Sequence, residues 1–337
     1  DQYGADTLRF FLTTNSAPGM DLRYIPEKLE ASWNFINKIW NSARFVLMNI
    51  DGDLEYKDLK FDHLNLCDKW ILNRLNNVIE EVDANMDKFE FVNVGSELYK
   101  FIWDDFCSWY IELTKVHLNS DNEVEKQASA HTLVYVLNAI VRMLHPFMPF
   151  VTEEIYQAIP HLEESICISK YPTVNPDFND ENINKQFTYL MDIVKGVREI
   201  RANYTIKNAI EVEYSIETKD ENLQALLDQC VPYLKKLCNA TCVGYNQEAS
   251  KDVATAMIQG GNTLIVELGA YVDKEAEKQK LQAELQKLEG EIKRCTNMLS
   301  NEKFVSKAPQ AKVDSERQKL EDYTSKYNAV KEKLAAM

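Results

Sequence analysis

Apolar residues recur every three or four positions through most of the first half of the chain, which is the period of an amphipathic helix. This pattern predicts helices near residues 26–50, 63–86, 91–118, 122–145 and 149–159. The run from His145 to Phe150 holds two prolines, and we expect it to break the helix because proline lacks the backbone N–H that a helix interior needs. Helices of this length joined by short connections predict an antiparallel helix bundle.

The pattern changes between Tyr171 and Asp180, where Pro, Asn and Asp accumulate as they do at a domain boundary. Beyond it, residues 211–217 alternate apolar and polar side chains as a half-buried strand does. Two further apolar runs flank Gly260 and Gly261, which is typical of a hairpin with a tight turn. With helices expected near 182–203 and 221–238, these segments predict a small α+β unit.

The last part of the chain carries two heptad seams, in which apolar residues alternate by four and three. The first consists of Leu281, Leu285, Leu288, Ile292, Cys295 and Leu299, and the second of Leu320, Tyr323, Tyr327, Val330, Leu334 and Met337. The ten residues 300–309 interrupt the pattern, so the two seams predict an antiparallel coiled-coil hairpin. Each seam can pack on the other, and we therefore expect a monomer.

These patterns together predict a mainly α protein with an antiparallel helix bundle, a small α+β unit and a C-terminal coiled-coil hairpin. The expected domains are a connecting segment at 1–25, the bundle at 26–175, the α+β domain at 181–269 and the hairpin at 271–337.

Composition is that of a globular protein, with 45% hydrophobic and 27% charged residues among 337. The sequence contains no apolar run long enough to span a membrane and no signal peptide at its first residues. Seven cysteines without a CxxC pair favour reduced thiols and a cytoplasmic location. The chain begins without Met, and we expect a fragment of a longer protein or a processed chain.

Charge is distributed unevenly along the chain, whose formal net charge is −15. Residues 271–337 hold 14 basic and 12 acidic residues, a net of +2, and the remainder carries a net of −17. An acidic total argues against nucleic-acid binding, but it does not exclude a local RNA site.

Catalytic motifs are absent from the sequence: it has no Walker loop, GxSxG, GxGxxG or HExxH. The five histidines are isolated, and we expect structural roles for them. The closest cysteines are Cys230, Cys238 and Cys242, for which a zinc site would need a fourth ligand that is not nearby. We therefore expect no catalytic residue, no metal site and no cofactor in this chain.

One helix carries a large aromatic residue on its polar side. Projected as a helix, residues 29–50 place Phe45 in line with Asn34, Lys38 and Asn41, with Arg44 on the same polar arc. Single-stranded RNA bases stack on such rings, and amides and cations beside the ring bind base edges and phosphates. The alternative is that Phe45 packs under a neighbouring loop.

Two other groups of residues allow both an RNA-binding role and a purely structural or solvated one. The same projection places Ile111 among polar residues with Glu112 beside it, and a carboxylate can accept from the amino group of cytosine or adenine. The alternative there is a solvated charge beside a secondary packing contact. Basic residues gather toward the tip of the hairpin, where they bind phosphates or form a solvated face: Lys293, Arg294, Lys303, Lys307, Lys312 and Lys319.

Several segments resemble class I aminoacyl-tRNA synthetases, and in particular the valyl-tRNA synthetase family. Residues 3–10 are similar to the segment that comes after the KMSKS loop of class I enzymes. The similarity to the valine family lies in residues 33–45, 103–112 and 145–150, and above all in residues 299–309 (LSNEKFVSKAP) between the two seams. It covers nearly the whole chain and is weakest between about 205 and 260, a stretch to which we assign no function.

The resemblance implies that the bundle reads the valine anticodon, whose second and third bases are A and C. It implies that Phe45 stacks on a base, that Lys38 and Arg44 make basic contacts and that Ile111 and Glu112 read bases. It further implies that the hairpin packs on the outer corner of valine tRNA, with Arg294 and Lys319 at matching basic positions. The HIGH and KMSKS signatures are not in the sequence, so ATP and Mg²⁺ are expected only in a catalytic domain outside it.

A rival hypothesis is a helical scaffolding protein that uses its coiled coil to contact proteins. It predicts no tRNA affinity and an oligomer whose size depends on concentration. The aromatic and apolar residues at polar-face positions favour the RNA hypothesis.

Overall fold

The computed structural model describes residues 3–16, 19, 21–220, 223–248, 252–271, 274–300 and 310–335. Its contacts group the chain into two compact units. One consists of Asp1–Arg198, Glu211–Gln247 and Ala256–Leu264, and the other of Glu199–Ile210, Glu248–Thr255 and Ile265–Met337. None of the helices in the described part of the chain combines the length and apolarity needed to cross a membrane.

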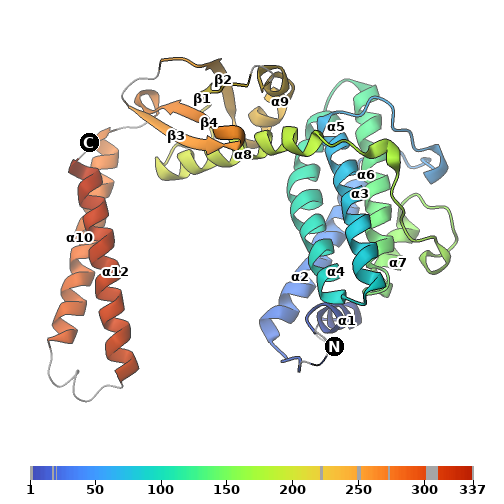
Figure 1. Ribbon diagram of the computed structural model, residues 1–337, viewed down its shortest axis with the longest axis horizontal. Helices are drawn as coiled ribbons and strands as arrows, with labels where there is room; N and C mark the ends of the chain where they lie inside the picture. The colour runs from blue at the N-terminus through green and yellow to red at the C-terminus, as the bar shows by residue number, and fades with distance from the viewer. Residues whose placement is uncertain are drawn as a thin grey trace. The chain divides into compact units, whose positions relative to one another are not determined.

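The first unit contains the helix bundle that the sequence predicts (Figure 1). Its helices are α2 (Pro26–Leu47), α3 (Leu66–Asp87), α4 (Phe91–Lys100), the π-helical segment η2 (Phe101–Tyr110), α5 (Ile111–Leu118), α6 (Glu123–Leu144) and α7 (Pro149–Ala158). Three short 3₁₀ turns accompany them, namely η1 (Tyr56–Asp58), η3 (Ile166–Ile168) and η4 (Pro176–Phe178). Because α4, η2 and α5 succeed one another without a break, they form the single long helix expected over 91–118.

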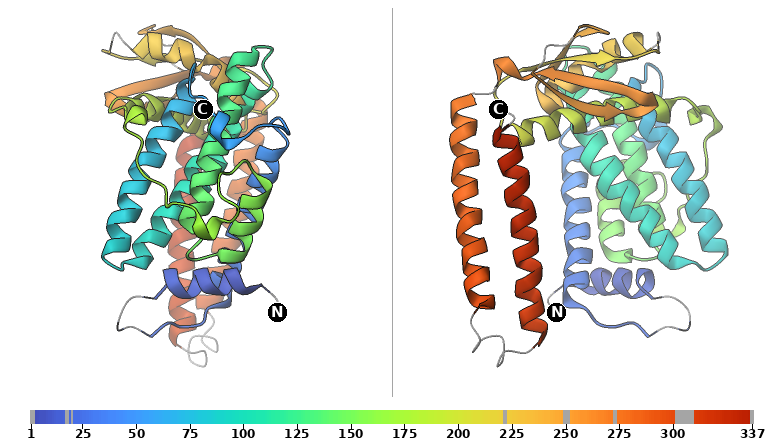
Figure 2. Two further views of the ribbon diagram at one scale, coloured as in Figure 1. Left: turned by 90° about the vertical axis from the view of Figure 1, so that its right-hand side faces the viewer. Right: turned by 60° about the vertical axis from the view of Figure 1, so that its left-hand side comes forward.

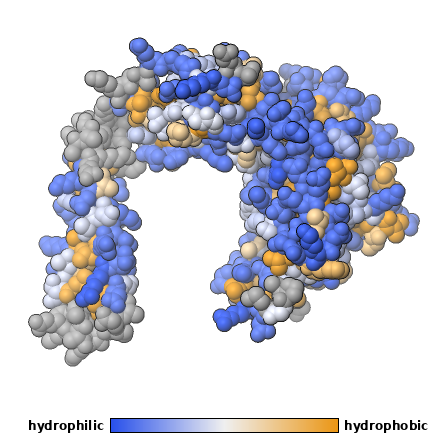
Figure 3. All heavy atoms as spheres, viewed as in Figure 1, coloured by the Kyte–Doolittle hydropathy of each residue, from blue (hydrophilic) through white to orange (hydrophobic). Residues whose placement is uncertain are grey.

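Local chemistry explains where these helices begin. Proline occupies the first turn of α2 and α7, where its missing N–H costs nothing. The side chains of Asn65 and Asn122 accept hydrogen bonds from the first-turn N–H groups of α3 and α6. Aliphatic and aromatic side chains fill the core, and those of Phe35, Ile71 and Leu137 have no exposed surface. Hydrophilic residues cover most of the visible outer face, with hydrophobic residues in small patches (Figure 3).

Helix α1 (Ala5–Thr14) lies in the segment that the sequence pattern treats only as a connection, so that expectation is incomplete. Three of the five residues on its buried face, Asp6, Thr7 and Thr14, are polar, so this face is not an apolar stripe. The helix packs closely on α4, since a Cβ added to Gly95 would overlap the side chain of Thr14. The Asp6 carboxylate accepts a 2.7 Å hydrogen bond from Val151 N–H and so caps the first turn of α7.

The α/β elements are α8 (Ile183–Asn203), β1 (Val212–Glu217), α9 (Leu223–Cys238), β2 (Ala240–Tyr245), β3 (Val253–Ile258) and β4 (Asn262–Glu267). The sheet order is β2-β1-β4-β3, and β1 pairs in parallel with β2 across the connection through α9. The turn between β3 and β4, η5 (Gln259–Gly261), places Gly260 and Gly261 at φ 77° and 74°, which confirms the two-glycine hairpin. The sequence pattern missed β2, because the residues after α9 show no clear alternation.

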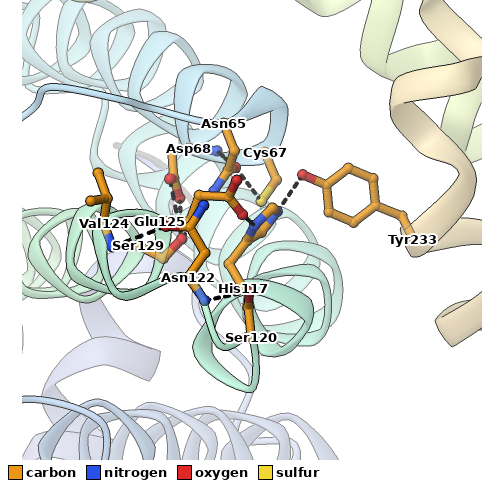
Figure 4. Close-up of polar contacts among 10 residues, drawn as sticks. All are labelled: Asn65, Cys67, Asp68, His117, Ser120, Asn122, Val124, Glu125, Ser129 and Tyr233. Carbon is orange, nitrogen blue, oxygen red and sulfur yellow. Dashed lines mark hydrogen bonds and ion pairs between the residues drawn. The ribbon is translucent and has the colours of Figure 1, made fainter.

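A ring stack and a hydrogen-bond network join the bundle to α8 and α9 within the first unit. The rings of Trp70 on α3 and Phe187 on α8 stack with centroids 3.8 Å apart and planes 6° apart. His117 on α5 lies between Glu125 and Tyr233, so that α9 is bonded to α5 and, through His117, linked to α6 (Figure 4).

The second unit contains the helical hairpin, formed by α10 (Lys274–Leu299) and α12 (Gln310–Ala335) after the 3₁₀ turn η6 (Leu268–Ala270). The two helices lie side by side in Figures 1 and 2. The side chains of Leu281, Leu288 and Cys295 are buried between them, which confirms the first predicted seam. Met337 and the interruption at 301–309 lie outside the described residues.

Candidate nucleic-acid interface

One hollow of about 590 Å³ collects most of the residues predicted to bind a base. From α2 come Asn34, Lys38, Asn41 and Phe45, together with Asn37 and Ser42. The opposite wall comes from η2 and α5, and consists of Trp103, Cys107, Ile111 and Lys115. The polar face of one helix and a wall from a distant segment therefore form one site.

Phe45 lies off the bundle core, as expected, and is half-buried at the edge of the hollow. The ammonium of Lys115 lies 5.5 Å from the centroid of its ring. A cation at this distance is attracted by the face of an aromatic ring. The ring therefore forms part of an aromatic and cationic wall.

Lys38 forms a second pair of the same kind. Its ammonium lies 4.0 Å from the centroid of the Trp103 ring and donates a 3.1 Å hydrogen bond to Ser108 Oγ. Trp103 in turn stacks on Tyr99 with the ring planes 8° apart. Trp103 belongs to the motif that carries the family resemblance, but the helical projection gave no reason to place it opposite α2.

Ile111 does not lie where the helical projection placed it. That projection put it on an exposed polar side, but only 7% of its surface is exposed. The reason is the π-helical segment that precedes it, in which each turn takes more residues than in an α-helix, so a projection at 100° per residue is displaced. The same displacement leaves Trp109 only half-buried and makes Tyr110 part of the core. Ile111 still contributes an apolar patch to the hollow.

Glu112 and Arg44 lie outside the wall of the hollow, which the two sequence predictions did not foresee. Arg44 is exposed on α2. The Glu112 carboxylate accepts a 2.6 Å hydrogen bond from the ammonium of Lys115, which does line the hollow. Lys115 therefore connects the predicted carboxylate to the site. The sequence analysis did not single out Lys115, although its position three residues after Glu112 predicts an ion pair between them on a helix.

The floor of the hollow is uncharged. Burial raises the pKa of the Cys107 thiol to about 11, although a hydrogen bond with Ser42 Oγ opposes this shift. The thiol therefore stays protonated at neutral pH. Two ammonium groups facing an apolar floor and two aromatic rings favour a ligand that is flat and anionic.

In the helical hairpin, both described basic residues of the predicted tRNA contact bind the same carboxylate. Glu316 is 6% exposed, and it accepts a 2.7 Å hydrogen bond from Lys319. Arg294 lies 3.7 Å from its other oxygen, and also pairs with Glu291 at 2.9 Å. The hydrogen bond from Lys319 is the main cause that lowers the pKa of Glu316. Lys303 and Lys307 lie outside the described residues.

Among the described residues, no group of three or more His, Cys, Asp and Glu side chains could hold a metal ion. Cys230 and Cys238 are buried, and burial raises the pKa of the Cys230 thiol to about 12.

Comparison with protein families matches two separate stretches of the chain. Residues 68–216 match the anticodon-binding domain of tRNA ligases, and residues 273–337 match the tRNA-binding arm of valyl-tRNA synthetases. The first stretch includes the η2 and α5 wall of the hollow but not α2.

Several longer proteins that are similar to this chain are all valine–tRNA ligases. A valine–tRNA ligase from Listeria innocua is 43% identical over 340 residues, and one from Enterococcus faecalis is 43% identical over 339. A valine–tRNA ligase from Bacillus cereus is 44% identical over 338 residues. Each match covers 99–100% of this chain and 38% of the relative, so the chain spans well under half the length of these proteins. The chain belongs to the valyl-tRNA synthetase family, of which it carries the anticodon-binding domain and the tRNA-binding arm.

Proposed function

We propose that the hollow between α2 and the η2–α5 wall binds the anticodon bases of valine tRNA. The observation that carries this proposal is the pair of cation–ring contacts that face the same hollow, Lys38 with Trp103 and Lys115 with Phe45. An aromatic face accepts any base by stacking, and an ammonium beside it neutralises a phosphate. The choice of valine tRNA is supported by the similarity of the chain to valine–tRNA ligases.

The experiment that tests this function separates binding from folding. Phe45→Ala should weaken binding to an anticodon stem-loop by about 1–3 kcal/mol, which is the usual contribution of one stacked base. The melting temperature should change little, because the ring lies off the core. Phe150→Ala is the matched control, since Phe150 is 66% exposed on α7 and does not line the hollow. Unchanged affinity together with a large loss of stability would mean that Phe45 only packs.

For the helical hairpin we propose contact with the outer corner of the same tRNA. Its net charge of +2, against −17 for the rest of the chain, favours it as the part that approaches a polyanion. The seam between α10 and α12 buries its own apolar side chains, so no second copy is needed to cover them. Sedimentation should show a monomer over a wide concentration range, whereas the scaffold hypothesis requires association.

The ligation reaction itself is assigned to the rest of the enzyme. We propose that this chain binds valine tRNA in a cytoplasmic ligase that joins valine to it using ATP and Mg²⁺, and that it forms no aminoacyl adenylate on its own. The support is the lack of HIGH and KMSKS signatures in the sequence. Valine-dependent pyrophosphate exchange by the purified chain would contradict this assignment.

A further inference from the structure

Lys115 contacts two of the residues that the sequence predicts to bind a base, Phe45 and Glu112. Its ammonium donates a 2.6 Å hydrogen bond to Glu112 Oε1 and lies 5.5 Å from the centroid of the Phe45 ring. One cation therefore contacts a predicted base-reading carboxylate on α5 and the predicted stacking ring on α2.

The other cation of the site has different partners. Lys38 is held against the Trp103 ring and by Ser108 Oγ. Lys115 lies beside the Phe45 ring instead, and its ion pair with Glu112 leaves two of its three ammonium hydrogens for a ligand. The Glu112 Oε2 atom has no hydrogen-bond partner among the described residues, so it is free to accept.

These contacts have a spatial order. Phe45 and Lys115 both line the hollow, whereas Glu112 lies outside its wall and reaches it through Lys115. For a base stacked on the ring, the donor thus lies nearer to the centre of the base and the acceptor farther out. This is a donor–acceptor pair in a fixed order on one helical turn.

Adenine and cytosine match that order, because each has an exocyclic amino group, which donates, next to a ring nitrogen that accepts. At the corresponding positions of the Watson–Crick edge, guanine (O6 and N1–H) and uracil (O4 and N3–H) have the reverse order, an exocyclic oxygen that accepts next to a ring N–H that donates. Their oxygen would face a carboxylate, and their N–H would face an ammonium. A mismatch of this kind leaves both partners without a hydrogen bond.

We propose that Lys115 and Glu112 act as one base-reading pair that selects adenine and cytosine stacked on Phe45 over guanine and uracil, with Lys115 donating to the base directly. This inference rests on the proposed function of the hollow. Both side chains are partly exposed, at 30% for Lys115 and 45% for Glu112, and such ion pairs contribute little to folding stability. A role in binding can therefore be tested without unfolding the protein.

The experiment compares anticodon stem-loops whose loop carries A and C with versions that carry G and U, using fluorescence anisotropy. Lys115→Met should lower the preference for A and C over G and U by about ten- to a hundredfold, which is the discrimination expected of one bidentate contact. Exchanging the pair, Glu112→Lys with Lys115→Glu, keeps an ion pair but reverses the order, and should abolish or invert the preference. Lys126→Met is the matched control, since Lys126 forms the same i,i+3 pair with Glu123 on α6.

The outcomes separate the two proposals. If Phe45→Ala weakens binding by about tenfold or more and Lys115→Met leaves the base preference within about threefold of the wild type, the base-reading pair is wrong and the stacking site stands. If the wild-type chain binds none of the stem-loops, or Phe45→Ala changes nothing, the proposed function fails and the base-reading pair fails with it.

Discussion

His117 Nε2 lies 2.7 Å from the hydroxyl of Tyr233, and its Nδ1 lies 2.9 Å from the Glu125 carboxylate (Figure 4). A single imidazole on α5 thus binds both α6 and α9. The bundle and the α/β elements of the first unit share a polar contact that neither could make alone.

Tyr233→Phe should lower the free energy of unfolding by about 1–2 kcal/mol, because His117 loses a partner in a partly buried place. Urea denaturation measures this loss, and hydrogen exchange should become faster in α9. Tyr24→Phe is the control, since Tyr24 is 65% exposed and should tolerate the change. Equal stability of the two variants would show that the His117 contact contributes nothing to the fold.

Asp68→Asn should remove a pH dependence of stability. The Asp68 side chain is fully buried, and desolvation raises its pKa to about 6 despite hydrogen bonds from Tyr110 and Ser129. The folded state then holds this proton more tightly than the unfolded state, so stability from this group is highest below about pH 4 and falls as pH rises to about 6. Two pKa units correspond to about 3 kcal/mol.

The measurement is urea denaturation between about pH 4 and about pH 7 for the wild type and Asp68→Asn. Other carboxylates titrate in both proteins, so the difference between the two curves isolates this group. Asp104→Asn, on the exposed side of η2, is the control for the loss of one carboxylate. A difference that does not change with pH would contradict the buried-carboxylate explanation.

Ile111→Ala should destabilise the protein by about 2–5 kcal/mol, because it removes a buried side chain. Glu112→Gln, one residue later, should change the free energy of unfolding by less than about 0.5 kcal/mol. Ile168→Ala, at a 62% exposed position, is the control for the first change. If Ile111→Ala proved as mild as Glu112→Gln, Ile111 would be exposed in solution, as the helical projection placed it.

Exchanging both Arg294 and Lys319 for Gln should weaken the salt dependence of whole-tRNA binding. The slope of log affinity against log salt should become shallower by about two units. Each contact with a phosphate releases about one counterion, so two lost contacts remove about two. Arg317→Gln is the control, because Arg317 pairs only weakly with Asp314 at 3.8 Å on the same helix.

Binding of an isolated anticodon stem-loop should be the same for this double variant and the wild type, since the hairpin contact requires the outer corner of the tRNA. Removing residues 271–337 should give the same pattern more strongly. An unchanged slope for whole tRNA would mean that Arg294 and Lys319 serve only to neutralise Glu316.

Local pattern was sufficient for most of the helices, including the two of the hairpin. Amphipathic periods and heptads are properties of neighbouring residues, so α2, α3, α6 and the α10–α12 pair can be located without knowing what they contact. The alignment of Phe45 with Lys38 is of the same kind, because both lie on one regular helix. Helix α1 was missed because most of its buried face is polar, and strand β2 because its short segment has no clear alternation.

Contacts between distant segments were decided only by the tertiary structure. The π-helical segment η2 rotates the next turns of the same helix, and this rotation buries Ile111 and turns Lys115 toward Phe45. Trp103 meets Lys38 because two helices pack side by side. Sequence spacing measures neighbours along one helix, whereas a binding site depends on which faces of two helices meet, and that is determined by the packing of the whole core.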